Sequence, residues 1–300
     1  MKRALLLALL VSVLASAQEK PSKPPEMEVV LIGTGFPRPD PERAGPSTAV
    51  RIGEGLYLVD AGRGVMMRLA GSGLNWRGIT KVFLTHLHSD HTSGLPDVFT
   101  STWIFDRAVP LDVYGPKGTA QAMAGLEQFF AADIRIRREL TEKNVAAGAR
   151  IAAHVVKPGV AYQDSDVTIT AFEVDHSPVK PAFGYRFESH GRVVVISGDC
   201  RPTPELIRQA RNADVLVHEV YLPEFFDHHD SPEVAARLKH YHTSADEVGE
   251  VARDAQPKLL VLTHVIPADG EQEILRRASR HFQGKIVVGK DLMRFRVGSH

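Results

Sequence analysis

The chain has 300 residues, of which 43% are hydrophobic and 24% are charged, and its 36 Lys and Arg residues are balanced by 36 Asp and Glu residues. This composition is that of an ordinary globular protein and excludes an extensively disordered chain. The lack of a basic excess argues against a polynucleotide-binding protein, and the single cysteine excludes an internal disulfide.

The N-terminus differs in composition from the rest of the chain. Residues 1–17 begin with Lys2 and Arg3, continue with the apolar run "ALLLALLVSVL" and end in an A-x-A pattern. They predict a secretory signal peptide cleaved near Ala17, because the apolar run is shorter than the roughly 18 to 20 residues that span a bilayer. A membrane anchor or a buried helix is the alternative. Residues 18–26 predict an extended linker, and the protein is expected to be periplasmic or secreted, without a stable membrane span.

From residue 27 the chain alternates β-branched apolar runs with helical patterns. In the first half, strands are expected at residues 28–35, 47–53, 55–62, 81–86 and 111–115, and helices at 64–73 and 118–134. In the second half, strands are expected at residues 166–176, 182–188, 192–199, 214–220, 258–264 and 284–289, and helices at 244–255 and 271–282.

Two helix starts have specific signals. Thr203 and Pro204 predict a helix cap and a first helical turn, and Ser244 with Glu247 has the spacing of a capping box. No low-complexity linker interrupts residues 27–300, so one domain is expected there. Its two similar mixed halves predict two sheets packed face to face between helices, a four-layer α/β/β/α sandwich.

Residues 85–91, "THLHSDH", place three histidines and an aspartate directly after a predicted strand. Unpaired imidazoles beside a carboxylate would repel one another on protonation and would be costly to desolvate, whereas a divalent cation converts all of them into ligands. We therefore predict a metal site whose spacing serves two ions, with ligands His86 and His88 on one and Asp90 and His91 on the other.

Four residues cannot complete two coordination spheres, so further ligands are expected at other strand ends. His176, Asp199 and His264 each end an apolar run. We assign His176 to the first ion and His264 to the second, with Asp199 as the bridge between them. Taken alone, His176 or His264 would be read as a surface residue at a strand end.

The motifs "THLHSDH", "VDAG", "SGDC" and "LTH" resemble those of the metallo-β-lactamase superfamily, over residues 28–295. The segments "GTGFPRPDPERAGPS" and "LVHEVY" resemble the branch that holds ribonuclease Z and arylsulfatase-type hydrolases. The resemblance implies the αββα fold and two zinc ions per chain, with iron or manganese as alternative metals. It also implies that Asp60, in "VDAG", supports the metal-binding loop.

In this branch, the His that opens "HTSADEV" resembles a proton donor to the leaving group, which here is His242, and Glu219 in "HEV" resembles the acid that orients it. His242 precedes a predicted helix, whose dipole opposes an imidazolium and eases proton release. A solvated loop is the alternative. Asp90, His242 and Glu219 are thus the candidate catalytic residues, whereas His218 and Cys200 are expected to face away from the site.

Two zinc ions would lower the pKa of a bridging water, so hydrolysis is the expected reaction. The chain has only "FESHGRVVVI" where the resemblance to ribonuclease Z implies a long arm that grips RNA, and "LTHVIPAD" where it implies an aromatic residue and a downstream arginine. With predicted export, these differences favour an exported zinc hydrolase of small, anionic sulfate or phosphate esters and argue against nucleic acid as a partner.

Three other functions stay open: a β-lactam hydrolase, a ribonuclease Z-like phosphodiesterase, and a non-catalytic metal-dependent binding protein. A homodimer is also left open. Trp103 and Phe105 either rim the site or belong to the core. A cluster of positive charge near residue 136 either attracts anionic substrates or forms a solvated face. It consists of Arg135, Arg137 and Arg138.

Overall fold

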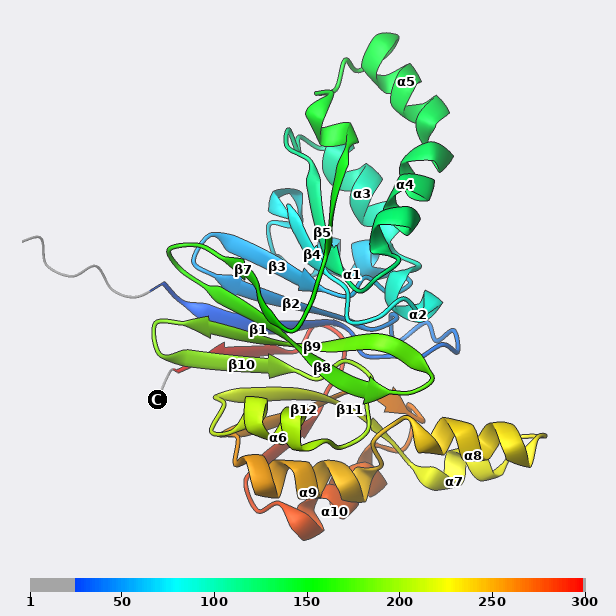
Figure 1. Cartoon of the computed structure of the whole chain (residues 1–300), viewed down its shortest axis with the longest axis vertical. Coiled ribbons are helices and arrows are strands. Elements are labelled where there is room, and N and C mark those ends of the chain that lie inside the picture. Colours follow the sequence, from blue (N-terminus) through cyan, green and yellow to red (C-terminus); the bar gives the residue numbers. More distant parts are fainter. Residues whose placement is uncertain (1–24, 299–300) are drawn as a thin grey trace, which may run out of the picture.

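The computed structural model describes residues 25–298. The predicted signal peptide, residues 1–17, and most of the predicted linker, residues 18–26, lie outside the described residues. Two seven-stranded sheets pack against each other, and helices cover their outer faces (Figure 1). Among the described residues, no helix combines the length and the apolar character needed to cross a bilayer.

The first sheet has the strand order β14-β1-β2-β3-β4-β5-β6. Its antiparallel part joins β14, β1, β2 and β3, and its parallel part joins β3, β4, β5 and β6. The strands are β1 (Met27–Gly33), β2 (Ser47–Ile52), β3 (Gly55–Val59), β4 (Lys81–Phe83), β5 (Leu111–Gly115), β6 (Ile151–Val155) and β14 (Arg294–Val297).

The second sheet has the strand order β13-β12-β11-β10-β9-β8-β7. Here β10 to β13 are parallel, and β7 to β10 are antiparallel. The strands are β7 (Gly159–Gln163), β8 (Thr168–His176), β9 (Val179–Ser189), β10 (Arg192–Ile196), β11 (Val215–Tyr221), β12 (Leu259–Ile266) and β13 (Lys285–Val288).

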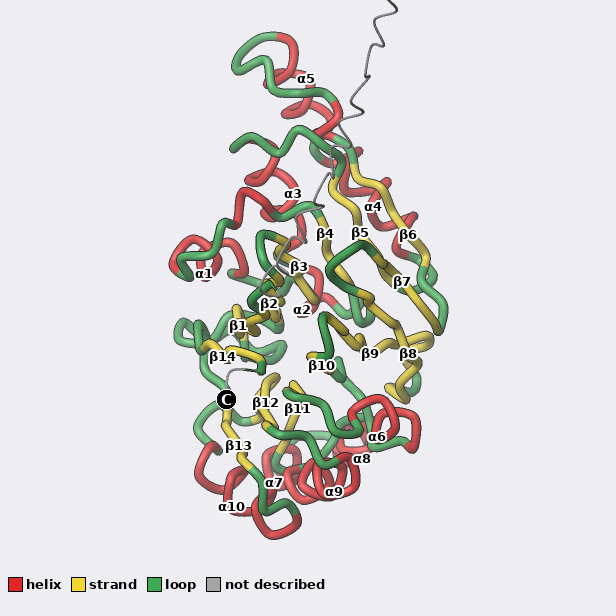
Figure 2. Tube along the Cα trace, turned by 90° about the vertical axis from the view of Figure 1, so that its left-hand side faces the viewer, coloured by secondary structure: helices red, strands yellow, loops and turns green. Residues whose placement is uncertain are grey.

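Helices lie outside both sheets, as the side view shows (Figure 2). Those on or near the first sheet are α1 (Val65–Gly71), α2 (Ser89–Thr92), α3 (Leu95–Ile104), α4 (Thr119–Phe129) and α5 (Ala131–Glu139), with short 3-10 turns at Trp76–Gly78 and Ala147–Ala149. Those on or near the second sheet are α6 (Pro204–Ala210), α7 (Pro223–Asp227), α8 (Pro232–His240), α9 (Ala245–Ala255) and α10 (Glu271–His281).

Three apolar layers follow from the alternation of side chains along the strands. In β1, Val29 and Leu31 face the layer between the sheets, while Val30 and Ile32 face the layer beneath α1, α3 and α4. A third layer joins the second sheet to α6, α9 and α10. Strands buried on both faces need continuous apolar runs, which is why the β-branched segments of the sequence identified them. The predicted four-layer sandwich is confirmed.

Most predicted elements are present, but their bounds and number differ. The helix expected over residues 118–134 is broken at Phe130, where α4 ends and α5 begins. The sequence did not indicate α3, in which β-branched and aromatic residues outnumber strong helix formers. It also did not indicate β6 and β7, whose partly exposed residues lack a long apolar run.

The fold brings the ends of several central strands to one edge of the sandwich. β4 belongs to the parallel part of the first sheet, and β10, β11 and β12 belong to the parallel part of the second. Parallel strands end at the same edge of their sheet, and the loops that follow them can therefore present side chains to a common site.

Candidate metal centre and active site

Three histidine side chains meet after β4 and at the end of β8. His86 Nε2 lies 3.0 Å from His88 Nδ1, and His176 Nε2 lies 3.4 Å from the same nitrogen. On the other side of each ring, His86 Nδ1 lies 3.0 Å from Thr85 Oγ1, and His176 Nδ1 donates to the carbonyl oxygen of Tyr241 at 3.0 Å. These outer contacts hold the rings so that their inner nitrogens face one another.

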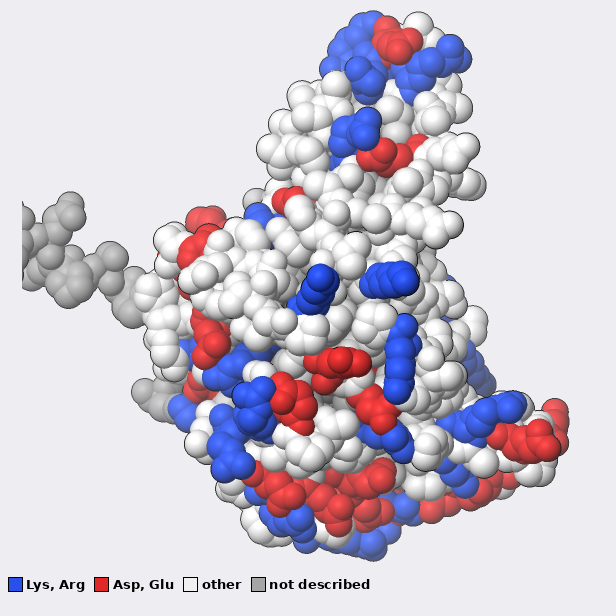
Figure 3. All heavy atoms as spheres, viewed as in Figure 1, with Lys and Arg blue, Asp and Glu red and all other residues white. Residues whose placement is uncertain are grey.

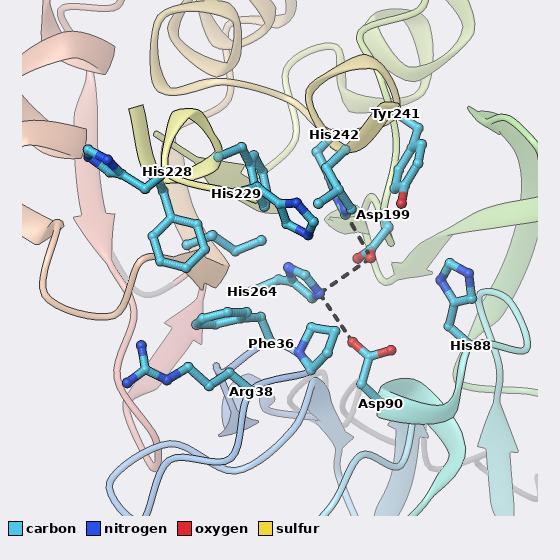
Figure 4. Close-up of a pocket in the computed structure, with 15 residues that line it drawn as sticks. Phe36, Arg38, His88, Asp90, Asp199, His228, His229, Tyr241, His242 and His264 are labelled. Atoms are coloured by element: carbon cyan, nitrogen blue, oxygen red, sulfur yellow. Dashed lines mark hydrogen bonds and ion pairs between the residues drawn. The ribbon is translucent and has the colours of Figure 1, made fainter. Parts of the chain in front are cut away.

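A second group combines carboxylates with imidazoles beside the first. Asp90 Oδ2 lies 3.5 Å from His91 Nε2 and 3.4 Å from His264 Nε2. Asp199 Oδ2 lies 3.3 Å from each of the same two nitrogens, and Figure 4 shows both carboxylates beside His264. Ligand atoms of Asp199, His86 and His91 also lie close enough to one another to hold one ion. The structure thus brings together all seven side chains predicted as ligands, with Asp199 between the two groups.

The spacing within these groups fits a divalent cation. Ligand atoms about 2.0–2.2 Å from a tetrahedral ion lie about 3.3–3.6 Å from one another, and the contacts of Asp199 and Asp90 fall in this range. His91 Nε2 is buried and has no hydrogen-bond partner among the described residues. It faces the carboxylates of Asp90 and Asp199 at 3.5 and 3.3 Å without a hydrogen bond to either. A buried nitrogen in this position is costly, and a cation between it and the carboxylates would satisfy it.

Asp60 connects the ligands of the two groups. Its carboxylate accepts hydrogen bonds from Thr85 N and from Thr85 Oγ1, both at 2.8 Å, and from His91 Nδ1 at 2.8 Å. Because the Thr85 hydroxyl gives its proton to Asp60, it accepts from His86 Nδ1. One carboxylate therefore orients His91 directly and His86 through Thr85. The sequence predicted a supporting role for Asp60 but gave no role to Thr85.

The electrostatic environment favours the metal-binding protonation states at His86 and Asp199 but not at His91. Burial lowers the pKa of His86 well below its usual value, and the charge of His91 lowers it further. Burial alone would raise the pKa of Asp199, but His264 and His91 hold it well below its usual range. Neutral imidazoles and ionised carboxylates are the forms that coordinate a cation. Burial alone would lower the pKa of His91, but the carboxylates of Asp199 and Asp60 raise it well above its usual value, so a bound cation would have to displace a proton from this imidazole.

His264 reaches the site through a β-bulge. Along β12, Thr263 pairs with Glu219 and Val265 pairs with Val220, so His264 is an extra residue without a partner on β11. Its φ is +47°, a conformation that costs energy for a residue other than glycine. A bulge re-aims a side chain that regular alternation would send elsewhere, and here it points Nε2 at the two carboxylates.

His242 and Glu219 form a buried pair next to this cluster. His242 Nδ1 lies 2.9 Å from both carboxyl oxygens of Glu219, and Glu219 Oε1 also accepts from Cys200 N at 2.8 Å. Burial lowers the pKa of His242, while burial and the charge of Asp199 raise the pKa of Glu219. The pair is thus anchored to the backbone beside Asp199, and the His242 ring lines the cavity described next.

A cavity of about 480 Å³ opens onto the cluster. One side is polar and includes His88, Asp90 and His242 (Figure 4). The other side is an apolar wall supplied by the segment after β1, by α7 and α8, and by the end of β12, and it consists of Phe36, Pro37, Phe225, Phe226, Leu238 and Ile266. The sequence gave no role to this wall, and the run "EFFDHH" at residues 224–229 was its only signal.

The remaining residues singled out from the sequence lie away from the cluster. His218 is buried and its Nδ1 donates to the carbonyl oxygen of Glu219, and Cys200 is buried in the layer beneath α6 and α9. Trp103 belongs to the core, and Phe105 is 49% exposed. The arginines at positions 135, 137 and 138 lie on α5, which projects at the end of the molecule opposite to α9 and α10 (Figure 3).

Known proteins match the chain over most of its length. The domain family described as "Beta-lactamase superfamily domain" matches residues 56–265. A protein of Mycobacterium bovis (strain BCG / Pasteur 1173P2) named ribonuclease Z is 39% identical over 277 residues, which are 90% of this chain and 98% of that protein. A ribonuclease Z of Mycobacterium tuberculosis (strain ATCC 25618 / H37Rv) is 38% identical over the same share of each chain.

Solved structures share the fold. The metallo-beta-lactamase fold protein YhfI from Bacillus subtilis has a TM-score of 0.71 at 21% identity, covering 90% of this chain and 99% of that one. The short form of human tRNase Z has a TM-score of 0.66 at 24% identity, covering 89% of this chain and 98% of that one. At this level of identity the likeness supports the fold alone.

The relatives overturn three of the sequence-based predictions. Relatives that align with nine tenths of this chain are named ribonuclease Z. The prediction of an exported, arylsulfatase-like hydrolase of small esters is therefore wrong, and the ribonuclease Z-like alternative is better supported. The expectation that nucleic acid is not a partner is wrong for the same reason. Two features of the sequence were misleading: its balanced net charge, and the short segment where the resemblance implies a long RNA-gripping arm. Neither excludes RNA, because a site that binds one phosphodiester needs only local charge.

The predicted periplasmic or secreted location is corrected by the same relatives. That prediction depended on the composition of residues 1–17, which lie outside the described residues.

Proposed function

Because the chain belongs to the beta-lactamase superfamily and, within it, to the ribonuclease Z family, we propose that it hydrolyses phosphodiester bonds in RNA. Membership of this family indicates a metal-dependent hydrolase of ester bonds. It therefore argues against the alternative of a non-catalytic metal-dependent binding protein. We take residues 27–300 as one hydrolase domain, because Met27 and Val297 belong to the same layer of core between the sheets.

We propose that two zinc ions bind at the cluster. His86, His88 and His176 would hold the first, and Asp90, His91 and His264 the second, with Asp199 shared. When bound, such ions activate a water molecule and stabilise negative charge on the oxygens of the phosphodiester. Zinc is favoured over manganese because most of the proposed ligands are imidazoles. It is favoured over iron because the resemblance to the family implies zinc.

The protein's own side chains would then position the substrate and move protons. Glu219 engages His242 Nδ1, which leaves Nε2 as the nitrogen that can protonate the departing oxygen. The anchoring of Glu219 by Cys200 N keeps the imidazole in one orientation. Asp90 lines the cavity and would accept a hydrogen bond from the attacking water.

The observation that carries this proposal is the His242–Glu219 pair beside a complete ligand set. A phosphodiester has a poorer leaving group than an activated ester, so its hydrolysis needs a proton donor as well as a nucleophile. The buried pair meets that need at the side of the cavity where the two carboxylates of the cluster lie.

The test uses the full chain loaded with zinc. Its substrates are a transfer RNA precursor with a 3′ extension, a single-stranded RNA oligomer and an aryl sulfate. We expect cleavage of RNA that stops on chelation and returns when zinc is added back. Hydrolysis of the aryl sulfate without any cleavage of RNA would overturn the proposal.

A pair of matched variants shows whether the cluster is responsible. Asp199→Ala should lose bound metal and RNA cleavage together, whereas Asp254→Ala, at an exposed position of α9, should retain both. Retention of RNA cleavage by a metal-free Asp199→Ala variant would contradict the assigned site.

A further inference from the structure

Two aromatic rings divide the active-site cavity from a second cavity. Phe36 and Phe225 pack edge to face, with ring centroids 5.7 Å apart and an interplanar angle of 87°. Both rings are half-buried. They line the cavity of the metal cluster and also a neighbouring cavity of about 620 Å³. The rings therefore form a partition between the two cavities. The second cavity is also lined by the carboxylates of Asp40, Glu224 and Asp269, which disfavour an anionic strand there.

The partition is fixed from behind by other aromatic side chains. Phe225 contacts Phe226 with centroids 5.4 Å apart, and Phe226 contacts Tyr221 at 5.4 Å. Phe226 and Tyr221 are buried, and they belong to the small apolar cluster under α7 and α8. A flat ring held in place by such packing offers a surface on which another flat group can stack. Because the protein ring is already ordered, stacking then costs little additional conformational entropy in the protein.

A cation stands beside the partition. Arg38 lines both cavities, and Figure 4 shows its side chain next to Phe36. It is exposed, and within residues 25–298 no salt bridge involves it. By contrast, the nearby Arg43 is buried and bonded to Glu271 at 2.6 Å. Arg38 is thus available for a phosphate, while Arg43 is committed to the fold.

We propose that Phe36 and Phe225 stack the nucleobase next to the scissile phosphodiester and that Arg38 binds the following phosphate. This inference rests on the proposed phosphodiesterase function and adds the side chains that would hold the base and the phosphate next to the cleaved bond. Base stacking on aromatic side chains is a general means of holding single-stranded RNA, and it tolerates every base.

The size of the effect follows from stacking. Loss of one stacked base contact costs about 1 to 3 kcal/mol, which corresponds to a factor of about 5 to 150 in kcat/KM. In an edge-to-face pair the edge of one ring covers a face of the other, so only part of the aromatic surface is open to a base, and we expect about a ten-fold preference.

The experiment compares two phosphodiesters with the same scissile bond, one with a nucleobase beside it and one with an abasic ribose there. The zinc-loaded wild-type chain should show about a ten-fold higher kcat/KM for the first. Phe225→Leu and Phe36→Leu should bring this ratio close to one, and Phe225→Tyr should keep it. Phe129→Leu, at a position 79% exposed on α4, is the matched control and should keep the wild-type ratio. Melting temperatures establish that each variant is folded.

A simple aryl phosphodiester separates base recognition from general aromatic binding. Arg38→Gln should raise KM for a trinucleotide more than KM for the aryl phosphodiester, because only the trinucleotide has a following phosphate. Equal wild-type rates on the base-bearing and abasic substrates would overturn the inference while leaving the phosphodiesterase function intact. A preference that survives both Phe→Leu substitutions would also overturn it. Failure to hydrolyse any phosphodiester would instead refute the proposed function.

Discussion

At the scale of single residues, Asp60 orients proposed metal ligands although it is not itself one of them. It accepts three hydrogen bonds, two from Thr85 and one from His91, and its own φ is +59°. A non-glycine residue held in this region is costly, and it persists where surrounding contacts fix it. The contacts here are those that orient the proposed ligands.

Asp60→Asn should therefore weaken metal binding. The amide must present an NH₂ group either to Thr85 or to His91, where only an acceptor fits. Loss of such supporting contacts typically costs 10- to 100-fold in metal affinity, which equilibrium dialysis against zinc would measure. Asp254→Asn, at an exposed position, is the matched control. Unchanged zinc affinity in Asp60→Asn would show that the carboxylate does not support the ligands.

His242→Ala tests the proton donor separately from the metals. A positioned general acid contributes about 10²- to 10⁴-fold, and this contribution shrinks when the leaving group departs without a proton. The variant should lose far more kcat on an alkyl or nucleoside phosphodiester than on a bis-aryl phosphodiester, with metal content unchanged. His281→Ala, at the end of α10, should match the wild type. Equal losses on both substrates would contradict the assignment.

At the scale of elements, irregularities rather than regular strands deliver two of the site's side chains. The bulge in β12 turns His264 into the cluster. A second register shift, between Val174 and His176 of β8, precedes the proposed ligand His176. Apart from these shifts, β12 pairs regularly with β11 and β8 with β9, so the irregularities change the direction of single side chains without disturbing the layers.

Helix α9 places the segment that carries His242. The Ser244 side chain accepts from Glu247 N and the Glu247 carboxylate accepts from Ser244 N, so the predicted capping box is confirmed. The α9 face below is buried against the second sheet. The helix start is thus fixed both by its cap and by packing, and His242 lies two residues before the cap Ser244.

Ser244→Ala should destabilise the fold modestly. Loss of an N-cap side chain costs about 1 kcal/mol, which corresponds to a fall of about 2 °C in Tm for a domain of this size. Thermal unfolding followed by circular dichroism would measure it. Ser279→Ala, at an exposed position in α10, should leave Tm unchanged. A Tm equal to the wild type in Ser244→Ala would show that packing alone fixes the helix start.

At the scale of the whole molecule, the proposed ligands come from both halves of the sandwich. His86, His88, Asp90 and His91 follow the first sheet, whereas His176, Asp199 and His264 belong to or follow strands of the second. A bound cation would therefore tie the two sheets together at one edge, in addition to the apolar layer between them.

Chelation should lower the thermal stability of the whole chain. A ligand present at 100 times its Kd stabilises the folded state by about 2.7 kcal/mol, so removal of zinc should lower Tm by about 5 °C or more. Differential scanning calorimetry with and without a chelator measures the shift. The Asp199→Ala variant serves as the control and should be insensitive to the chelator. A wild-type Tm that does not change on chelation would argue against a metal that links the sheets.

Local pattern in the sequence was sufficient for much of this architecture. Runs such as "KVFLT" and "RVVVIS" identify buried strands because burial on both faces demands apolar residues at every position. The order of elements then indicated the four layers, and imidazoles and carboxylates at strand ends indicated the cluster. These features depend on neighbouring residues and on the few ways in which sheets can pack, and both can be read along the chain.

Only the tertiary structure decided which surfaces those residues share. The hydrogen bonds from Thr85 to Asp60, the turn of His264 at a bulge, and the packing of Phe36 on Phe225 each join segments that are distant in the sequence. No local pattern encodes such contacts, because each partner alone is an ordinary polar or aromatic residue. The net charge of the chain and the short length of the segment where an arm was expected led to the wrong substrate for a related reason. Recognition depends on the few groups that line one cavity, and only folding brings those groups together.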